Sequence, residues 1–562
     1  MVVPVAIGDQ EGVDRSSWRG GGSRGVPRVL VAAASFVVLL AVLVARNAFL
    51  FSNSYSEAGD QGANSILIEQ ARQFKLLVGN YSRLGFNHPG PAYLYVQAWG
   101  EALWYDLLHA VPTAWNGQML AVYALYSVFV ALAVAVVYGW TRSAAAAAAC
   151  LAAIAGFAAI HPMILSSDWM PYLYVLTYAL FILAGASVAA GTARDLWIFA
   201  LAGWFLVHGH ASYLFFVPGM TVVVLVVLCW PRRRRIVAAL RAAPWASLRA
   251  LLGRQWRAWI PAAAISVVFV LPIVINLVLH WPGSFGKYFT YGSSSEAGGH
   301  SVSAVIDYVL WFWWPGSTAP TAPFVAIIPL LGSVIAIGLV WWCTGGPVRR
   351  FLLTLLAVDA VSFVLFIAYA AVGVDNLERN GHYIGYFFWS APLLTLVVAA
   401  VALAEALART LSRTAARRVL PAAAVALVAA GAIAAFTAAP LSRTSTSYSD
   451  PATPWMSPAD TDAAIPAAVA TLAARSPGQT LVHNLDHNAW GDLTGFLVQA
   501  ERTGVRACVD DPAWEFMVTS QFICTPQEAA AGAPYYFHFT AVPERGQVIT
   551  RMNATWVTVG PP

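Results

Sequence analysis

Acidic and basic side chains occur close together in residues 51–116, directly after the first long apolar run of the chain. Glu57 and Asp60 come first, and Arg83 and His88 follow within a Gly- and Pro-rich stretch. A carboxylate can take a proton from a reacting hydroxyl group. Cationic side chains can bind a phosphate group and neutralise its charge. The types and spacing of these residues are therefore typical of a base placed near a bound phosphate.

Structural roles are also open to the same residues. Asp60 can cap the helix that follows it, and Glu57 is held in reserve as a second candidate base. Arg83 and His88 can anchor the chain to lipid headgroups instead of a substrate. His88 is the weaker phosphate ligand of the two, because a histidine is not always charged.

Two short helices are expected to position these side chains. Residues 64–78 place apolar side chains on one face, as in a helix that lies in the membrane interface. Pro89 and Pro91 then interrupt the chain. A second interfacial helix, about residues 93–108, is expected to lead back to the next apolar run.

The composition requires a membrane. The 562 residues are 59% hydrophobic and only 10% charged, whereas soluble domains have about 25% charged residues. Apolar runs of about 18 residues or more recur, the length that crosses the hydrocarbon core as a helix. We predict an α-helical polytopic membrane protein with about eleven spans, near 29–50, 117–139, 143–164, 171–191, 195–209, 213–230, 259–280, 323–343, 351–372, 386–407 and 420–439. The pair 195–209 and 213–230 could instead be a re-entrant hairpin.

Lys and Arg residues predict the orientation. With the N-terminal tail, residues 1–28, in the cytoplasm, 20 of the 26 Lys and Arg residues before position 440 fall inside. The expected location is the cell membrane, and the segment 51–116 and the C-terminal region lie outside the cytoplasm. The net charge of +5 then reflects topology, so we expect membrane lipids and no nucleic acid as partners.

Beyond the membrane domain, residues 29–439, the chain changes in character. Residues 440–478 are rich in Ala, Pro, Ser and Thr and are interpreted as a linker. Residues 479–562 are predicted to form a small α/β domain, with strands near 480–486, 505–510, 535–540 and 555–559 and a helix near 489–501. Cys508 and Cys524 both lie in this domain, and an oxidising compartment favours a disulfide between them.

Other polar residues face the same side in this topology. Asp168 either caps a helix or binds a sugar hydroxyl or a divalent cation. His208 and His210 end a predicted span, and ionisable groups at membrane depth are functional candidates, although a backbone carbonyl can also satisfy a histidine. Lys287 and the run 311–314 could frame a lipid entrance or form part of an aromatic belt.

The loop 373–385 holds the densest outward cluster after residues 51–116: Asp375, Glu378, Arg379 and His382. The planar guanidinium of Arg379 matches the geometry of phosphate oxygens. Glu378 and Arg379 could equally pair with each other on the surface.

The loop after the first span resembles that of the GT-C glycosyltransferases, which are integral-membrane enzymes that use polyprenyl-phosphate sugars. It is most similar to the aminoarabinose lipid A transferases and protein O-mannosyltransferases, with a further suspected similarity to actinobacterial arabinofuranosyl- and mannosyltransferases. Three short motifs carry the resemblance: Gly59-Asp60, Gly79-Asn80-Tyr81 and Phe86-Asn87-His88-Pro89-Gly90-Pro91. The chain has Asn87 and His88 where the family pattern has Glu and Lys.

The resemblance implies transfer of a sugar from a polyprenyl-phosphate donor to a cell-envelope glycan or lipid acceptor, with inversion at the anomeric carbon. For this reaction we expect Asp60 to be the base, with Glu57 in reserve. From their residue types and their predicted outer location, we expect Arg83, His88, Lys287, Arg379 and His382 to bind the donor phosphate, and Asn87, Asp168, His208, His210 and Glu378 to bind substrate. A divalent cation (Mg, Mn or Ca) at Asp60 or Asp168 is an open alternative. The competing functions are a transporter or flippase of lipid-linked glycans and a non-catalytic assembly subunit. The transporter reading lacks support from internal repeats, which the sequence does not show.

Overall fold

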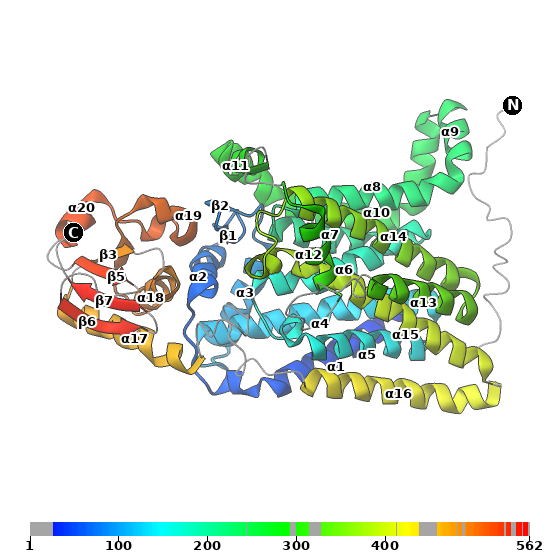
Figure 1. The fold of residues 1–562 in the computed structure, drawn as a ribbon, viewed down its shortest axis with the longest axis horizontal. Coiled ribbons are helices and arrows are strands. Elements are labelled where there is room, and N and C mark those ends of the chain that lie inside the picture. Colours follow the sequence, from blue (N-terminus) through cyan, green and yellow to red (C-terminus); the bar gives the residue numbers. More distant parts are fainter. Residues whose placement is uncertain are drawn as a thin grey trace.

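The apolar runs of the sequence form helices that lie side by side in a computed structural model of the chain (Figure 1). The structure describes residues 26–242, 244–292, 299–313, 327–411, 413–437, 458–478, 480–485, 489–532, 536–540, 547–552 and 555–559. Within these ranges, each of the eleven predicted spans corresponds to an α-helix: α1 (Arg28–Arg46), α4 (Ala114–Thr141), α5 (Ala144–Ile160), α6 (Met170–Ala189), α7 (Leu196–Gly209), α8 (Tyr213–Cys229), α10 (Pro244–His280), α13 (Ile327–Cys343), α14 (Gly346–Val372), α15 (Ser390–Thr410) and α16 (Arg413–Thr437).

Among the described residues, six helical stretches are long and apolar enough to cross a membrane by length and composition: Arg28–Arg46, Ala114–Thr141, Met170–Ala189, Trp256–His280, Gly346–Val372 and Gly381–Thr410. α6 is buried along its whole length, as expected for a helix that is apolar on all sides. α10, in contrast, exposes Val267, Val268, Leu271 and Val278. An exposed apolar face of this size requires lipid in place of water. The predicted fold class of a helical, multi-pass membrane protein is confirmed.

The uncertain pair of spans forms two separate helices, α7 and α8. Residues 210–212 join them in a short turn. Pro218 lies inside α8, and α7 packs against α6 and α10. The chain therefore forms two helices in this region, as the prediction of two spans requires.

The segment between α1 and α4 contains both helices expected there, together with a hairpin. The elements are α2 (Gly59–Arg72), the antiparallel strands β1 (Tyr81–Ser82) and β2 (Phe86–Asn87), and α3 (Ala92–Gly100), which continues as the π-helix Glu101–Leu107. Most of α2 is buried because it packs between α3 and the C-terminal domain. It does not lie on a lipid surface, so its apolar side chains are covered by protein on both sides.

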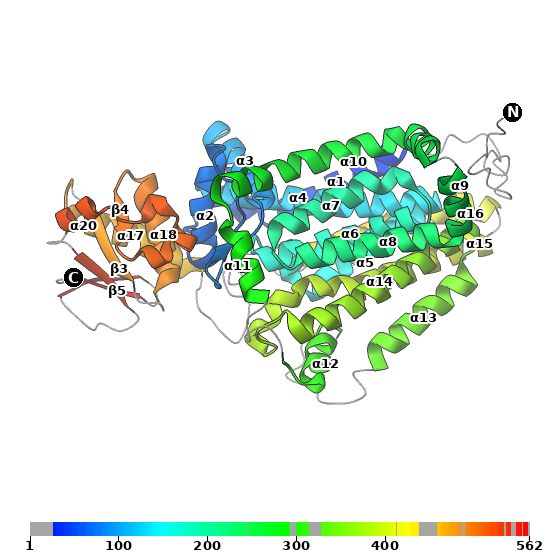
Figure 2. The same cartoon turned by 90° about the horizontal axis from the view of Figure 1, so that it is seen from above.

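The C-terminal domain lies at one end of the helix bundle, as two perpendicular views show (Figures 1 and 2). Its five-stranded sheet has the order β4-β3-β5-β7-β6, from β3 (Leu481–Leu485), β4 (Ala507–Val509), β5 (Tyr536–Thr540), β6 (Gln547–Met552) and β7 (Thr555–Val559). β3 pairs in parallel with β4 and β5, and the other pairs are antiparallel. The four predicted strands and the predicted helix, α18 (Trp490–Arg502), are present, whereas β6 was not predicted.

A disulfide and an additional helix also belong to the C-terminal domain. Cys508 and Cys524 form the expected disulfide. α17 (Pro458–Arg475) lies within the predicted linker, and Ile465, Val469 and Leu472 on it are fully buried in the core of the domain. This part of residues 440–478 therefore belongs to the domain, and its low sequence complexity hid an apolar helical face.

The C-terminal domain is joined to the loop after α1 by a close contact between α2 and α18. A Cβ atom on Gly62 would lie 2.7 Å from Oγ1 of Thr494, and one on Gly495 would lie 2.1 Å from the backbone oxygen of Glu57. The hydroxyl of Thr494 donates a 3.0 Å hydrogen bond to the carbonyl of Gly59. These glycines allow the two backbones to approach each other, which fixes the domain over the start of α2.

Candidate active site

Asp60 lies in the first turn of α2, where the close contact with the C-terminal domain begins. The preceding residue, Gly59, has a φ of 60°, a conformation that glycine adopts without strain. Oδ1 of Asp60 accepts a hydrogen bond from the phenol of Tyr81. Oδ2 accepts one from the indole nitrogen of Trp169 at 2.6 Å. Three separate parts of the chain thus orient this carboxylate.

The electrostatic environment of Asp60 suits a general base. Burial raises the pKa of Asp60, and the hydrogen bonds from Tyr81 and Trp169 lower it in part. A carboxylate with a raised pKa binds a proton more readily than an ordinary one. The carboxylate is half-buried, so its surroundings include both protein and solvent.

Asp168 lies beside this carboxylate, in the turn between α5 and α6. Its Oδ1 accepts a 2.7 Å hydrogen bond from the side chain of Gln61, and its Oδ2 accepts a 2.8 Å bond from the indole of Trp115. Adjacent residues of α2, Asp60 and Gln61, are thus tied to adjacent residues of the turn, Asp168 and Trp169. Burial raises the pKa of Asp168 to about 6, against the lowering effect of its hydrogen bonds. The arrangement makes Asp168 a support for the start of α2.

Glu57 has its oxygens occupied by the C-terminal domain. Two guanidinium nitrogens of Arg502, on α18, each lie 2.8 Å from one of its carboxylate oxygens. The hydroxyl of Ser65 donates a further hydrogen bond at 3.1 Å. The side chain of Glu57 is only 3% exposed. This geometry favours a docking role for Glu57 over its predicted reserve role as base.

The β1–β2 hairpin brings two predicted phosphate ligands to one place. Arg83, at its tip, donates to both oxygens of Asp375 at 2.7 and 2.5 Å, which connects it to the loop that precedes Arg379. The ammonium group of Lys287, on α11 (Gly283–Gly292), donates to the carbonyl of Gly85. Both cations remain exposed, so a phosphate group can reach them.

Mainly structural contacts are made by Asn87 and by three of the four predicted histidines, His88, His208 and His210. The amide of Asn87 donates to the carbonyl of Phe516 at 3.3 Å, and His88 accepts a 3.2 Å hydrogen bond from the backbone of Ala211. Burial, together with the neighbouring His210, holds the pKa of His88 well below its ordinary value. A neutral imidazole cannot supply positive charge, which argues against phosphate binding by His88.

His208 and His210 are also satisfied by nearby groups. Nδ1 of His208 accepts from the backbone of Ala92 at 3.2 Å, and Nε2 lies 2.7 Å from the carbonyl of Phe269. The ring of His210 lies 4.2 Å from that of His88, and its Nδ1 lies 2.9 Å from the hydroxyl of Ser212. These contacts connect the α7–α8 turn to the start of α3.

The segment after α14 borders the site with aromatic rings. Residues Arg379–Trp389 form a 3₁₀-helix. The ring centre of Tyr383, on this helix, lies 5.4 Å from that of Trp169. Tyr383 is also close enough to Asp60 and Arg83 to interact with their charges. The ring of His382 lies 4.5 Å from that of Trp311, at the end of α12 (Val302–Trp311). Glu378 is exposed. The side chain of Arg379 lies outside the described residues.

The carboxylates of Asp60 and Asp168 are occupied by side-chain donors. Each of their four oxygens accepts one hydrogen bond, from Tyr81, Trp169, Gln61 or Trp115. A divalent cation at these carboxylates would have to share every oxygen with one of these donors. In the ranges that the structure describes, no group of three or more His, Cys, Asp or Glu residues is suited to hold a metal ion.

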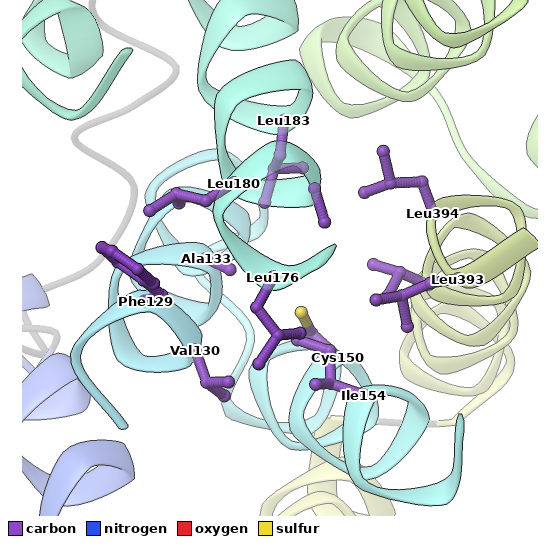
Figure 3. A pocket seen from close by; sticks show the side chains of 12 residues that line it. Phe129, Val130, Ala133, Cys150, Ile154, Leu176, Leu180, Leu183, Leu393 and Leu394 are labelled. Carbon is purple, nitrogen blue, oxygen red and sulfur yellow. The ribbon is translucent and has the colours of Figure 1, made fainter. Parts of the chain in front are cut away.

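A cavity inside the bundle differs from this site because its lining is apolar. It lies between α4, α5, α6 and α15 and is lined by apolar side chains, among them Phe129, Cys150, Leu176 and Leu393 (Figure 3). Its lining offers neither a carboxylate nor a cation.

Several residues of the site were not among the sequence predictions. Tyr81 stands in the turn motif that carries the family resemblance, and Trp169 follows Asp168 directly, so local signals existed for both. Gln61 and Trp115 carried no such signal. Arg502 could not be connected with Glu57, because 445 residues separate them.

Comparison with solved structures decides the fold. The chain is similar to ArnT from Cupriavidus metallidurans in the apo state, with a TM-score of 0.51 and 15% identity over 95% of this chain and 99% of that chain. This chain has the GT-C fold. A second similar structure is the archaeal oligosaccharyltransferase AglB from Archaeoglobus fulgidus in complex with an inhibitory peptide and a dolichol-phosphate, with a TM-score of 0.36 and 12% identity over 84% and 63% of the two chains.

No protein-family model and no curated protein sequence matches the chain. The likeness to ArnT is therefore one of fold, at a sequence identity of 15%. It accounts for both parts of the architecture, since the similarity to ArnT extends over nearly the whole of each chain.

Proposed function

We propose that the protein is a membrane glycosyltransferase that moves a sugar from a polyprenyl-phosphate donor to a cell-envelope glycan or lipid acceptor. The observation that carries this proposal is the position of Asp60, a half-buried carboxylate held by Tyr81 and Trp169 at the junction of the bundle and the C-terminal domain. The GT-C fold supports the same class of reaction. The predicted orientation places this junction on the outer face of the membrane.

In the proposed reaction, an acceptor hydroxyl oxygen attacks the anomeric carbon of the donor sugar. The bond from that carbon to the phosphate oxygen breaks, and the phosphate leaves with the electron pair. Asp60 receives the hydroxyl proton. Arg83 and Lys287, both exposed near the hairpin, neutralise the departing phosphate. A single displacement of this kind inverts the configuration at the anomeric carbon.

The test is transfer of labelled sugar by the purified protein. Polyprenyl phosphates linked to mannose, arabinofuranose or aminoarabinose serve as donors, and membrane extracts of the host supply acceptors. Asp60→Asn preserves the size of the side chain but removes its basicity, so the rate of transfer should fall by a factor of about 10² to 10⁴.

Asp307→Asn is the matched control, because Asp307 is an exposed aspartate on α12 to which no role in the site is assigned. It should transfer sugar at close to the normal rate. Normal transfer by Asp60→Asn would refute the assignment of the base. Failure of the wild type to consume any of the three donors, in transfer or in hydrolysis, would contradict the proposed function itself.

A further inference from the structure

Four aromatic rings surround the contact between the C-terminal domain and the hairpin. We call Tyr81, Trp490, Trp514 and Phe516 the aromatic platform. The ring centre of Tyr81 lies 6.1 Å from that of Trp490 and 6.0 Å from that of Phe516. Trp514 is stacked on Phe516 at 6.4 Å. One ring comes from the loop after α1, and three come from the C-terminal domain.

The platform is partly open to solvent. All four side chains are intermediate in exposure, although each packs against the core of the C-terminal domain. Rings whose only role was to seal the interface would gain more free energy from complete burial. Partial exposure of four neighbouring rings is typical of a surface that receives a ligand.

The platform is also attached directly to Asp60. Tyr81 contributes its ring to the platform and its hydroxyl to the carboxylate. Trp490 is the first residue of α18, and a Cβ atom on the next residue, Gly491, would lie 3.6 Å from Cα of Gly59. Phe516 lies on α19 (Glu515–Val518), which contacts both α2 and β1. A molecule on these rings would therefore have one end beside Asp60.

The chemistry of the platform matches a saccharide. A sugar ring presents an apolar face of C–H groups and a rim of hydroxyls, so it can stack on an aromatic ring while its hydroxyls remain in water. The donor has to place its phosphate near Arg83 and Lys287 and its lipid tail against the bundle. Three of its four rings belong to the C-terminal domain, on α18, on α19 and in the turn Pro512–Trp514 before α19, and this domain lies at the end of the bundle (Figure 1). The position suits the molecule that must bring a hydroxyl to Asp60.

We propose that the aromatic platform binds a saccharide ring of the acceptor and delivers its hydroxyl to Asp60. This inference rests on the proposed function and specifies the acceptor as a glycan, or a lipid that carries one, held by its sugar. Tyr81 then acts in two ways, because it forms part of the acceptor surface and positions the base.

The experiment uses the full-length protein and two defined probes, a linear mannotriose and a linear arabinofuranotriose. Binding is measured by saturation-transfer NMR, and transfer is measured as a function of acceptor concentration. Trp490→Ala should weaken binding of the trisaccharide that the wild type prefers and raise the KM for it about tenfold, which corresponds to one aromatic contact. Hydrolysis of the donor in the absence of acceptor should stay within about twofold of the wild-type rate, since the proposal assigns the donor phosphate to Arg83 and Lys287 and not to the platform.

Two control variants keep the result interpretable. Trp490→Phe retains a ring, so it should recover most of the affinity that Trp490→Ala loses. Trp556→Ala removes a tryptophan from β7, near the opposite edge of the sheet, where Arg551 lies over its ring at 5.0 Å. It should leave acceptor binding unchanged.

Two outcomes would overturn the inference: an unchanged KM in Trp490→Ala, or no binding of either trisaccharide to the wild type. Both differ from failure of the proposed function. In that case the wild type would consume no polyprenyl-phosphate sugar, whether or not it bound a trisaccharide.

Discussion

The indole nitrogen of Trp169 donates a 2.6 Å hydrogen bond to Oδ2 of Asp60, and so joins two residues that lie 109 positions apart in the sequence. Tyr81 holds the other oxygen. Both donors favour the ionised carboxylate, whereas burial favours the neutral form and raises the pKa of Asp60. The balance between burial and these donors determines the pH above which Asp60 can act as a base.

Trp169→Phe should move the acidic limb of the pH–rate profile to higher pH. The variant keeps a ring but loses a hydrogen bond to the ionised carboxylate, so the pKa of Asp60 rises further. A base must be ionised, and activity at low pH is therefore lost earlier in the variant. The measurement is kcat for sugar transfer across about pH 4 to 8, a range that extends upward from the ordinary pKa values of carboxylates. Trp140→Phe, which removes an indole bond to Ser187 instead, should leave the profile in place.

Asp168→Asn should make the stability of the protein less dependent on pH. The pKa of Asp168 is raised to about 6 by burial, so the folded protein binds a proton there more tightly than the unfolded chain. The wild type then loses stability as the pH rises from the ordinary range of aspartate through about 6. An asparagine does not titrate, and this loss should be absent. Thermal unfolding in detergent at several pH values measures the effect, and Asp307→Asn, at an exposed position on α12, is the control.

Helix positions could be predicted from the sequence because the relevant signals are local. Long apolar runs predicted α4 and α6, and short runs of strand-forming residues predicted β3 and β7. Asp60 stood out because it follows a span and precedes an amphipathic helix. Strand β6 was missed, since Gln547–Met552 mixes polar and apolar residues without clear alternation. These outcomes follow from patterns that extend over only a few neighbouring residues.

Contacts between distant residues could not be predicted in this way. The pairing of Arg502 with Glu57 depends on how the C-terminal domain docks. The lowered pKa of His88 depends on its burial and on the neighbouring His210, which lies far from it in the sequence. The sequence shows His88 only as a basic residue in a loop. The pKa of this histidine depends on its surroundings in the folded protein, and these cannot be read from the residue type alone.

Arg83→Ala and Asp375→Asn should change donor binding in opposite directions. Arg83 is exposed and paired with Asp375, so a donor phosphate has to compete with that carboxylate. Removing the cation should raise the KM for the donor by about tenfold, as for the loss of a charge-assisted hydrogen bond. Neutralising Asp375 should lower the KM by about twofold to threefold, in line with an exposed ion pair. A rise of the KM in both variants would show that the pair serves structure alone.

The ion pair between Glu57 and Arg502 should stabilise docking of the C-terminal domain. Arg502→Met leaves a buried carboxylate without its partner and should weaken docking by about 3 kcal/mol. The double variant Glu57→Gln/Arg502→Met should recover much of this loss, because no buried charge then remains. Limited proteolysis between the bundle and the domain measures docking. The activity of the double variant adds a second test: near-normal transfer agrees with a docking role for Glu57, and complete loss would restore it as a candidate base.

Gly495→Ala should separate the C-terminal domain from α2. A Cβ atom at this position would lie 2.1 Å from the backbone oxygen of Glu57, and backbone atoms cannot move aside as a flexible side chain can. Overpacking of this kind costs about 3 kcal/mol. Gly491→Ala, four residues earlier on the same helix, is the matched control, since its Cβ would meet its nearest neighbour at an ordinary 3.6 Å. Proteolytic sensitivity and sugar transfer should both change in Gly495→Ala and neither in Gly491→Ala. If both variants kept full transfer activity, Asp60 would not need the docked domain, and the close contact between α2 and α18 would have no part in catalysis.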